Sequence, residues 1–342
     1  MRARRGEGAR RGGALDPRVR RYAGRVSSRI AAENRGLALA VDLGGTKVEA
    51  ALVDDSGRVL AGTRERRPTG AGATSEQLVA SVRGVVGATL ATLPAGATLI
   101  GAGIGAAGPI QVGPGLASPL NLPAWRGHPL RSLVAESVPG LPVRMQMDGL
   151  CITLAEHWVG AARGRSDVMG MVVSTGIGGG LILGGRTVTG PTGNAGHIGH
   201  VEVAGFDDEC PCGGRGCLEA VASGPRTVLW AQTEGFDGAT GEDLASAYSA
   251  GDEVAVRAVR RAGHAIGQAI ASATSLVDLE LVAIGGGFSH VSPDLFDFIR
   301  ESIAARASFG FVTKVEVVPS GLSGDGPLIG AAALIHRAEL VA

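Results

Sequence analysis

The chain has 342 residues, of which 45% are hydrophobic, and its acidic and basic side chains balance to a formal net charge of +0. This length is sufficient for one large or two modest domains with buried cores. Neutrality excludes a global field that would draw the protein to nucleic acid or to an anionic membrane, and no apolar run approaches the roughly 20 residues that span a bilayer. We therefore expect small ligands as partners, with no nucleic acid and no membrane.

Residues 1–36 are rich in arginine and glycine and lack the apolar core of a secretory signal. We expect them to form a disordered basic tail, because neither helical periodicity nor interleaved aromatic residues accompany the charge. The missing export signal favours a cytoplasmic protein.

A strand pattern, a glycine-containing turn and two further strand patterns follow one another twice along the chain. The first unit comprises strand 37–42, turn 44–47 and strands 48–53 and 58–63, and the second comprises strand 168–174, turn 175–180 and strands 181–183 and 186–189. This repetition indicates a duplicated unit.

Alternating helical and strand patterns follow each unit. Helices are predicted at 75–90, 130–136, 149–162, 253–277, 293–305 and 327–338, and strands at 99–104, 143–146, 279–284 and 315–318. Such alternation, with mixed strand directions, predicts an α/β fold in two lobes, with ligands bound in the cleft between them. We expect an N-terminal lobe at 37–148, joined by the closing helix at 327–338, and a C-terminal lobe at 149–326.

The first turn, Gly44-Gly45-Thr46-Lys47, has the composition of a phosphate cradle. Paired glycines let the backbone approach an anion and point its N–H groups inward, and Asp42 at the end of the preceding strand can hold a hydrated magnesium ion. The turn is neither a Walker A loop nor a dinucleotide fingerprint, because GxxxxGK[ST] is absent and no helix follows. By itself, an ordinary tight hairpin would be the better interpretation.

Two further glycine clusters change that interpretation. The second turn, with Thr175, Gly176 and Gly178, offers another group of N–H donors at the equivalent place in the other half. Two facing hairpins would clamp one polyphosphate. Gly285 and Gly286 end a later strand, where an adenosine would lie flat on the backbone. Together the three clusters predict ATP binding.

Phosphoryl transfer requires positioning, charge neutralisation and a base that receives the proton of the acceptor. Asp148 follows the strand predicted at 143–146 and opens the helix predicted at 149–162, so its carboxylate would lie at a helix N-terminus that keeps it ionised. It is a candidate general base, and an equally good alternative is that it only caps the helix.

Three of the four cysteines, Cys210, Cys212 and Cys217, lie close together in a chain without an export signal. Such clustering favours metal binding over disulfides. With His200, they supply the Cys₃His set of a closed structural zinc site, although the spacing is irregular for a zinc finger. The alternative is a glycine loop with surface cysteines.

A zinc-ordered loop over 197–219 would bring His197, His200 and Glu219 together. The volume between these side chains would hold a polyol.

These motifs together resemble the ROK family of sugar kinases, whose fold is the duplicated, two-lobed, actin-like ATPase fold related to ribonuclease H. The resemblance runs from about residue 37 to the C-terminus. Its most specific part is His200 with the three clustered cysteines and Gly216-Cys217-Leu218-Glu219-Ala220, followed by 42–47 and 174–180. It implies a cytoplasmic, homodimeric ATP:hexose or hexosamine phosphotransferase with ATP, magnesium and a structural zinc.

The resemblance also implies roles for individual residues. Asp148 would deprotonate the 6-hydroxyl of the sugar, His200 would both bind zinc and face the sugar, and Glu219 would hydrogen-bond sugar hydroxyls. Gly108 and Asn121 match positions near the sugar. The implied magnesium and ATP contacts agree with those inferred from the motifs above.

Two departures from the family pattern bear on the sugar. Most of these kinases have glutamate two residues before Gly199, whereas this chain has His197, a form that looks like that of bacterial N-acetylmannosamine kinases and favours an amino sugar. The family usually has Asn-Asp where this chain has Met147-Asp148, so a thioether that cannot donate replaces an amide that would bind a ring hydroxyl. An N-acetylmannosamine-like, a glucose-like and another amino sugar all stay open.

Some members of the family are sugar-sensing transcriptional regulators with a winged-helix module ahead of the sugar domain. Here residues 1–36 precede that domain and lack helical periodicity. This favours an enzyme over a regulator or a non-catalytic sugar-binding protein.

Overall fold

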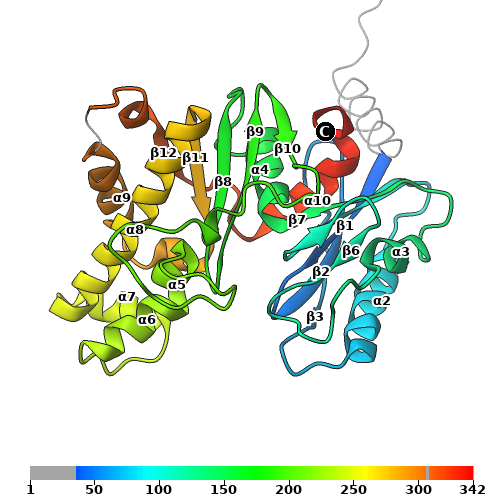
Figure 1. Cartoon of the computed structure of the whole chain (residues 1–342). Helices are drawn as coiled ribbons and strands as arrows, with labels where there is room; N and C mark the ends of the chain where they lie inside the picture. The colour runs from blue at the N-terminus through cyan, green and yellow to red at the C-terminus, as the bar shows by residue number, and fades with distance from the viewer. Residues whose placement is uncertain (1–35, 306–307, 342) are drawn as a thin grey trace, which may run out of the picture.

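Two five-stranded sheets lie in separate halves of the computed structural model, which describes residues 36–305 and 308–341 (Figure 1). The first sheet contains, in spatial order, β3 (Glu65–Pro68), β2 (Lys47–Val53), β1 (Gly36–Leu43), β4 (Thr98–Ala106) and β7 (Val143–Met147). The second contains β10 (Arg186–Val188), β9 (Ile177–Leu183), β8 (Val168–Val173), β11 (Leu281–Gly285) and β12 (Glu316–Pro319). In each, three antiparallel strands are extended by two parallel ones. The equivalent orders confirm the predicted α/β class and the duplicated unit.

Alternating side chains of β1 divide the core of the first half into two faces, as the two-residue period of a strand requires. Leu39 and Val41 pack in the cluster that includes α2 (Ser75–Ala91) and α3 (Leu130–Ala135), whereas Ala40 packs with α10 (Gly326–His336). Small residues bring α10 close to the sheet: a Cβ added at Gly103 would lie 1.7 Å from the carbonyl oxygen of Ala331.

The helix that follows the last strand of each sheet packs against the other half. Helix α4 (Asp148–Val159) follows β7 but contacts β8 and β9, whereas α10 follows β12 but contacts β1 and β4. Glycine permits close packing here. A Cβ added at Gly149 of α4 would lie 2.4 Å from the carbonyl oxygen of Gly179 in β9, and a Cβ added at Gly330 of α10 would lie 1.8 Å from the carbonyl oxygen of Cys151, where the two helices pack on each other. We call α4 and α10 the crossing helices.

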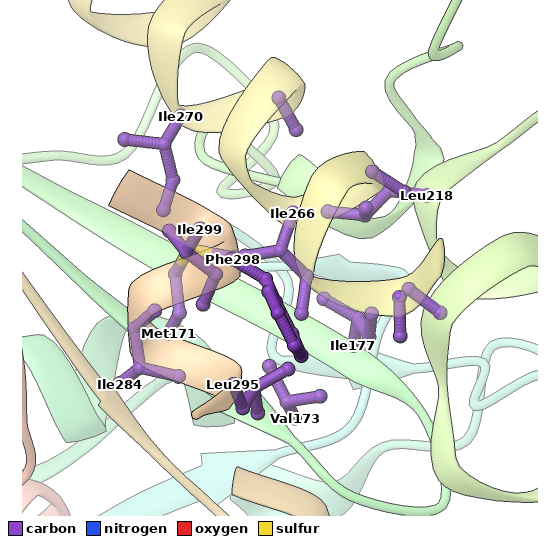
Figure 2. Close-up of a cluster of buried hydrophobic side chains, with 14 of the residues drawn as sticks. Met171, Val173, Ile177, Leu218, Ile266, Ile270, Ile284, Leu295, Phe298 and Ile299 are labelled. Carbon is purple, nitrogen blue, oxygen red and sulfur yellow. The ribbon is translucent and has the colours of Figure 1, made fainter. Parts of the chain in front are cut away.

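The core of the second half is built on the long helix α8 (Glu253–Val277), which has the bounds that the sequence predicted. Figure 2 shows Phe298 of α9 (Leu295–Ala304) packed beside Ile266 of α8, with Val173 of β8 below them. Leu218, the first residue of α5 (Leu218–Ala222), is fully buried in the same cluster. The core therefore anchors the chain immediately after Cys217.

The third strand of the first unit is not at 58–63, as predicted, but at Glu65–Pro68. Residues 58–63 make only an isolated bridge at Val59, because Thr63 turns back and its hydroxyl accepts a hydrogen bond from the N–H of Leu52 at 3.1 Å. The strand that replaces it is an edge strand of charged residues ending in proline, which an apolar pattern does not reveal.

The second glycine turn is shorter than predicted, since Gly178, Gly179 and Gly180 belong to β9 and pair with β8. These glycines serve a close approach and not a loop: a Cβ added at Gly180 would lie 2.4 Å from the Cα of Leu150 in crossing helix α4. The turn itself is limited to Ser174–Gly176.

Three helices between 218 and 249 were not predicted, namely α5, α6 (Gly224–Thr233) and α7 (Gly241–Ser249). The short strands β5 (Ile110–Gln111) and β6 (Leu116–Ala117) complete the strands of the described chain. The predicted tail at 1–36 lies outside the described residues except for Gly36, which begins β1, and the domain boundaries stay a prediction. No helix among the described residues has the length and apolar character needed to cross a bilayer.

Candidate functional site

Asp42 lies near the end of β1 in a buried, charged environment. Its cross-strand partner on β2 is Glu49, which is 2% exposed and accepts hydrogen bonds from Lys47 Nζ and Arg66 Nε, each at 2.6 Å. Burial, then the charge of Asp148, then that of Glu49 raise the pKa of Asp42 from 3.8 to about 7, against an opposing effect of Lys47. Its carboxylate would exchange a proton for a divalent cation, so it fits one oxygen ligand of a magnesium site.

The first hairpin turn, which the sequence identified as a phosphate cradle, is held on both sides. The N–H of Gly44 donates to the carbonyl of Lys47 at 2.9 Å, and the hydroxyl of Thr69 donates to the carbonyl of Gly44 at 3.0 Å. Gly45 faces Asn121, where an added Cβ would lie 2.8 Å from the Asn121 Cβ. Predicted phosphate and sugar contacts thus meet at this turn.

Asn121 is exposed on a loop that its neighbours anchor. Leu122 and Trp125 are fully buried, and the indole N–H of Trp125 donates to the hydroxyl of Ser75 at 3.2 Å. The anchored loop holds the exposed amide beside the glycine turn.

The second hairpin turn is fixed by Glu219. The carboxylate of Glu219 accepts a hydrogen bond from the N–H of Ile177 at 2.8 Å, and a Cβ added at Gly176 would lie 2.6 Å from the same carboxylate. Thr175 is exposed at the tip of the turn. Glu219, predicted at the sugar, is therefore in direct contact with a predicted ATP hairpin.

Asp148 is the first residue of crossing helix α4, and Met147 occupies the N-cap position, so Asp148 is not the cap. Its carboxylate accepts a hydrogen bond from the N–H of Gly149 at 2.7 Å and lies 3.8 Å from the position of a Cβ added at Gly178. Burial raises its pKa to about 6, with the charge of Glu219 acting in the same direction and the Gly149 N–H opposing. Such a carboxylate is ionised at neutral pH and close enough to its pKa to exchange protons.

His197 meets Gly108 and Met147 where loops of the two halves join. A Cβ added at Gly108 would lie 2.7 Å from His197 Nε2 and 3.3 Å from Met147 Sδ, so a larger residue there would displace the His197 ring. The junction is held by Asn194, whose side chain accepts from the N–H of Ile110 at 2.9 Å and donates to its carbonyl at 2.7 Å. Burial and the neighbouring His200 lower the pKa of His197, which keeps its ring neutral.

His200, Cys210, Cys212 and Cys217 form a compact set whose ligand atoms lie within 4.8 Å of one another. Cys210 Sγ lies 3.7 Å from His200 Nδ1, and Cys212 Sγ lies 3.7 Å from Cys217 Sγ. Zinc–sulfur bonds of about 2.3 Å at tetrahedral angles separate two sulfurs by about 3.8 Å, so the set fits zinc. The nearby Gly214 leaves room, since an added Cβ would lie 3.0 Å from Cys217 Sγ.

The ionisation of the thiols also fits a cation. Burial and the two neighbouring thiols raise the pKa of Cys217 to about 12, and burial raises that of Cys210, whereas the Gly214 N–H lowers that of exposed Cys212. A bound zinc ion would displace the thiol protons and hold all three cysteines as thiolates.

A cavity of about 380 Å³ opens beside the second hairpin turn. Ser174 and Thr175 line it with Gly287, whereas the predicted Gly285 and Gly286 do not line it. The sequence missed most of its other walls, which come from α6, α7 and the segment after Gly287: Gly224, Pro225, Val228, Ala239, Thr240, Gly241, Glu242, Ala245, Phe288, His290 and Val291. One available signal was the capping box of Thr240 and Asp243 at the start of α7.

Comparison with known proteins gives matches over nearly the whole chain. A family model described as the ROK family matches residues 38–338. A glucokinase of Thermotoga maritima is 32% identical over 316 residues, or 87% of this chain and 97% of the relative. An N-acetylmannosamine kinase of Shigella boydii is 33% identical over 307 residues, or 88% of this chain and 99% of the relative. A crystal structure of a ROK family glucokinase from Streptomyces griseus, in complex with glucose and AMPPNP, has a TM-score of 0.75 at 31% identity and covers 88% of this chain and 100% of its own.

Proposed function

Because this chain belongs to the ROK family and has its actin-like ATPase fold, we propose that it is a sugar kinase that transfers the γ-phosphate of ATP to a hydroxyl of a hexose or amino sugar. The observation that carries this proposal is the place of Asp148. Its half-buried carboxylate, with a pKa near 6, faces the second hairpin and is close enough to Asp42 for their charges to interact. One site therefore combines a proton acceptor with a candidate cation ligand.

In this proposal the nucleotide lies between the two halves. The adenosine occupies the cavity of about 380 Å³ beside Ser174 and Gly287. The phosphates extend from there to the N–H groups of the two turns, 44–47 and 174–176, since backbone donors in glycine turns bind anions. Gly178, at the start of β9, lies beside the Asp148 carboxylate, which is 3.8 Å from the position of a Cβ added there.

Asp42 would hold magnesium, which when bound neutralises charge on the phosphates. The protein's own side chains accept the proton and position the reacting groups. Asp148 accepts the proton of the attacking sugar hydroxyl, and its protonated form is stabilised by the same burial that raises its pKa. Lys47 is held by buried Glu49 at the start of β2, beside the first turn.

The sugar would lie against His197, His200, Glu219, Asn121 and the backbone at Gly108, which leaves the Met147 thioether as an apolar part of its pocket. The neutral ring of His197 would bind a substituent by hydrogen bonding and not by charge. An N-acetylated or other amino sugar is the favoured acceptor, because His197 stands where most of the family has glutamate. Zinc held by His200 and the three cysteines would order the loop that carries Glu219.

Buried Met147 favours a second candidate, a protein that binds sugar without phosphorylating it, since its thioether cannot replace the lost amide. One experiment separates the two. ADP release is measured in a coupled assay with ATP and magnesium over glucose, mannose, N-acetylmannosamine, N-acetylglucosamine, glucosamine and 3-amino-3-deoxyglucose. Turnover with any of them, lost in Asp148→Asn, supports the kinase. Sugar and ATP binding without turnover would instead support the sugar sensor.

A further inference from the structure

One row of residues crosses the whole first sheet at the level of Asp42. Arg66 lies opposite Glu49, Glu49 opposite Asp42, Asp42 beside Gly105, and Gly105 beside Gln146. Partners in register on neighbouring strands project from the same face of a sheet. Gln146 therefore faces the same side as Asp42, and between them stands a residue without a side chain.

Gln146 is 3% exposed, yet its Oε1 has no hydrogen-bond partner in the described part of the chain. Buried carbonyl oxygens are almost always paired with protein or with ordered water. The side chains nearest Gly105 are the Asp42 carboxylate, an acceptor when ionised, and the Cys151 thiol, a weak donor: a Cβ added at Gly105 would lie 3.6 Å from Asp42 Oδ1 and 3.3 Å from Cys151 Sγ, and among the described residues neither donates a hydrogen bond to Gln146 Oε1. The Asp42 carboxylate thus leans toward Gly105, on the side from which Gln146 approaches.

We propose that Gln146 is a positioning residue for the divalent cation, and that its Oε1 and the Asp42 carboxylate accept the two protons of one water of the cation's hydration shell. This inference rests on the proposed function, which places the cation at Asp42. Magnesium keeps several of its waters in protein sites, and each bound water has two protons to donate. Strands two places apart are separated by about 9.5 Å, a span that two side chains and one water fill.

The competing explanation is that the unpaired Oε1 of Gln146 is only an imperfection of packing. Thr89 in α2 and Thr274 in α8 have equally buried hydroxyls that find no hydrogen-bond partner among the described residues. Gln146 differs from both because it shares a row with Asp42 and stands two residues before Asp148 on the same chain. A threonine of this kind is therefore a matched control.

The test measures Mn²⁺ binding by electron paramagnetic resonance in the full-length, ADP-saturated protein, without sugar. Gln146→Leu is expected to weaken Mn²⁺ binding about 10-fold, as loss of a group that orients a metal ligand typically does, while ADP affinity in the absence of metal is unchanged. Gln146→Glu, which keeps an acceptor at the same place, is expected to bind Mn²⁺ about as well as the unaltered chain. Thr274→Val is expected to bind it unchanged.

An unchanged Mn²⁺ affinity in a folded Gln146→Leu protein overturns the inference, and so does an equal loss in Thr274→Val. If Gln146→Leu does not fold, Gly105→Ala replaces it, because its added methyl would lie 3.3 Å from Cys151 Sγ and 3.6 Å from Asp42 Oδ1, on the side of Asp42 from which Gln146 approaches, and should weaken Mn²⁺ binding similarly. Absence of Mn²⁺ binding in the unaltered ADP complex also overturns it. Failure of the kinase proposal looks different: the unaltered protein would bind Mn²⁺ and ADP in a Gln146-dependent way and yet transfer phosphate to no sugar.

Discussion

Glu219 and Ile177 join the cysteine loop to the second hairpin: the Glu219 carboxylate accepts a hydrogen bond from the N–H of Ile177 at 2.8 Å. Glu219 follows Cys217 by two positions in the chain, and Leu218, which separates them, is buried in the core. We therefore expect a disturbance of the cysteines to reach the second hairpin turn, which we place at the phosphates.

Loss of zinc is therefore expected to weaken the binding of both the sugar and ATP. We expect one zinc per chain by elemental analysis, and in Cys212→Ser a loss of zinc with the sugar KM raised at least about 10-fold, because Glu219 loses its fixed position. Arg215→Gln is the matched control in the same loop. It breaks only an exposed ion pair with Glu209 and should leave zinc content and KM unchanged. Unaltered kinetics in zinc-free protein would contradict the link.

Replacing the proposed base should abolish turnover without abolishing nucleotide binding. Asp148→Asn is expected to lower kcat by about 10² to 10⁴, the usual contribution of a positioned base, with ATP affinity by calorimetry nearly unchanged. Asp297→Asn, at an exposed ion pair on α9, serves as the control. A variant at Asp148 that turns over normally would remove this residue from the mechanism.

The rate should depend on pH through the same carboxylate. Below its pKa of about 6 in the ligand-free protein, Asp148 is protonated and cannot accept the hydroxyl proton, so kcat/KM for the sugar is expected to fall as pH drops through about 6. Initial rates at sugar concentrations well below KM, with saturating ATP, between about pH 5 and 8 measure this limb. A limb that persists unchanged in the residual activity of Asp148→Asn would assign it to another group.

The charged form of Asp148 should also lower the free energy of unfolding at neutral pH. A folded pKa of about 6 against an ordinary 3.8 means that burial favours the protonated form, so the carboxyl's contribution is fully present below about pH 4 and is lost as pH rises through about 6. Asp148→Asn removes the charge and is expected to be more stable than the unaltered chain by about 1 to 3 kcal/mol at pH near 8, with little difference near pH 4. Urea unfolding at both pH values measures the change, and equal differences at the two would refute the assignment.

His197 is expected to determine the choice of sugar. In His197→Ala, loss of a neutral hydrogen-bonding ring should raise the KM of the preferred sugar about 10-fold or more, corresponding to about 1 to 3 kcal/mol for a polar group left unpaired. The KM for ATP should stay constant, because the predicted contacts of His197 are to sugar. His290→Ala, at the wall of the 380 Å³ cavity, should show the reverse pattern. An unchanged sugar KM would exclude His197 from the pocket.

The elements that could be predicted from the sequence have strong local signals. Helix α8 was placed with its observed bounds because its apolar stripe continues over 25 residues between Asp252 and Asp278. Strand β3 was misplaced because its residues are charged and pair at a sheet edge. Helices α6 and α7 are short, so the signals at their starts, Pro225 in α6 and the capping box of Thr240 and Asp243 in α7, were better than their periodicity.

The residues of the candidate site likewise divide into those that the sequence could identify and those that only the fold brings together. Asp148, the cysteines and the glycine turns are recognisable because their partners are close in the chain or belong to a family motif. The row through Asp42, Gly105 and Gln146 depends on the register of three strands that are far apart in sequence, and no local pattern carries that information. The cavity beside Gly287 likewise exists only once α6 and α7 are packed.

The crossing helices constrain the order in which this chain can mature on the ribosome. The face of β1 that carries Ala40 is covered by α10, which is synthesised about 290 residues later. Until then the first sheet exposes a strip of alanine and glycine. Helix α4 is likewise synthesised before β8 and β9, the strands of the second half that it packs against. Because each half takes a helix from the chain of the other, a chain truncated near residue 320 lacks α10 and is expected to give an aggregation-prone product in which the first sheet stays uncovered on one face.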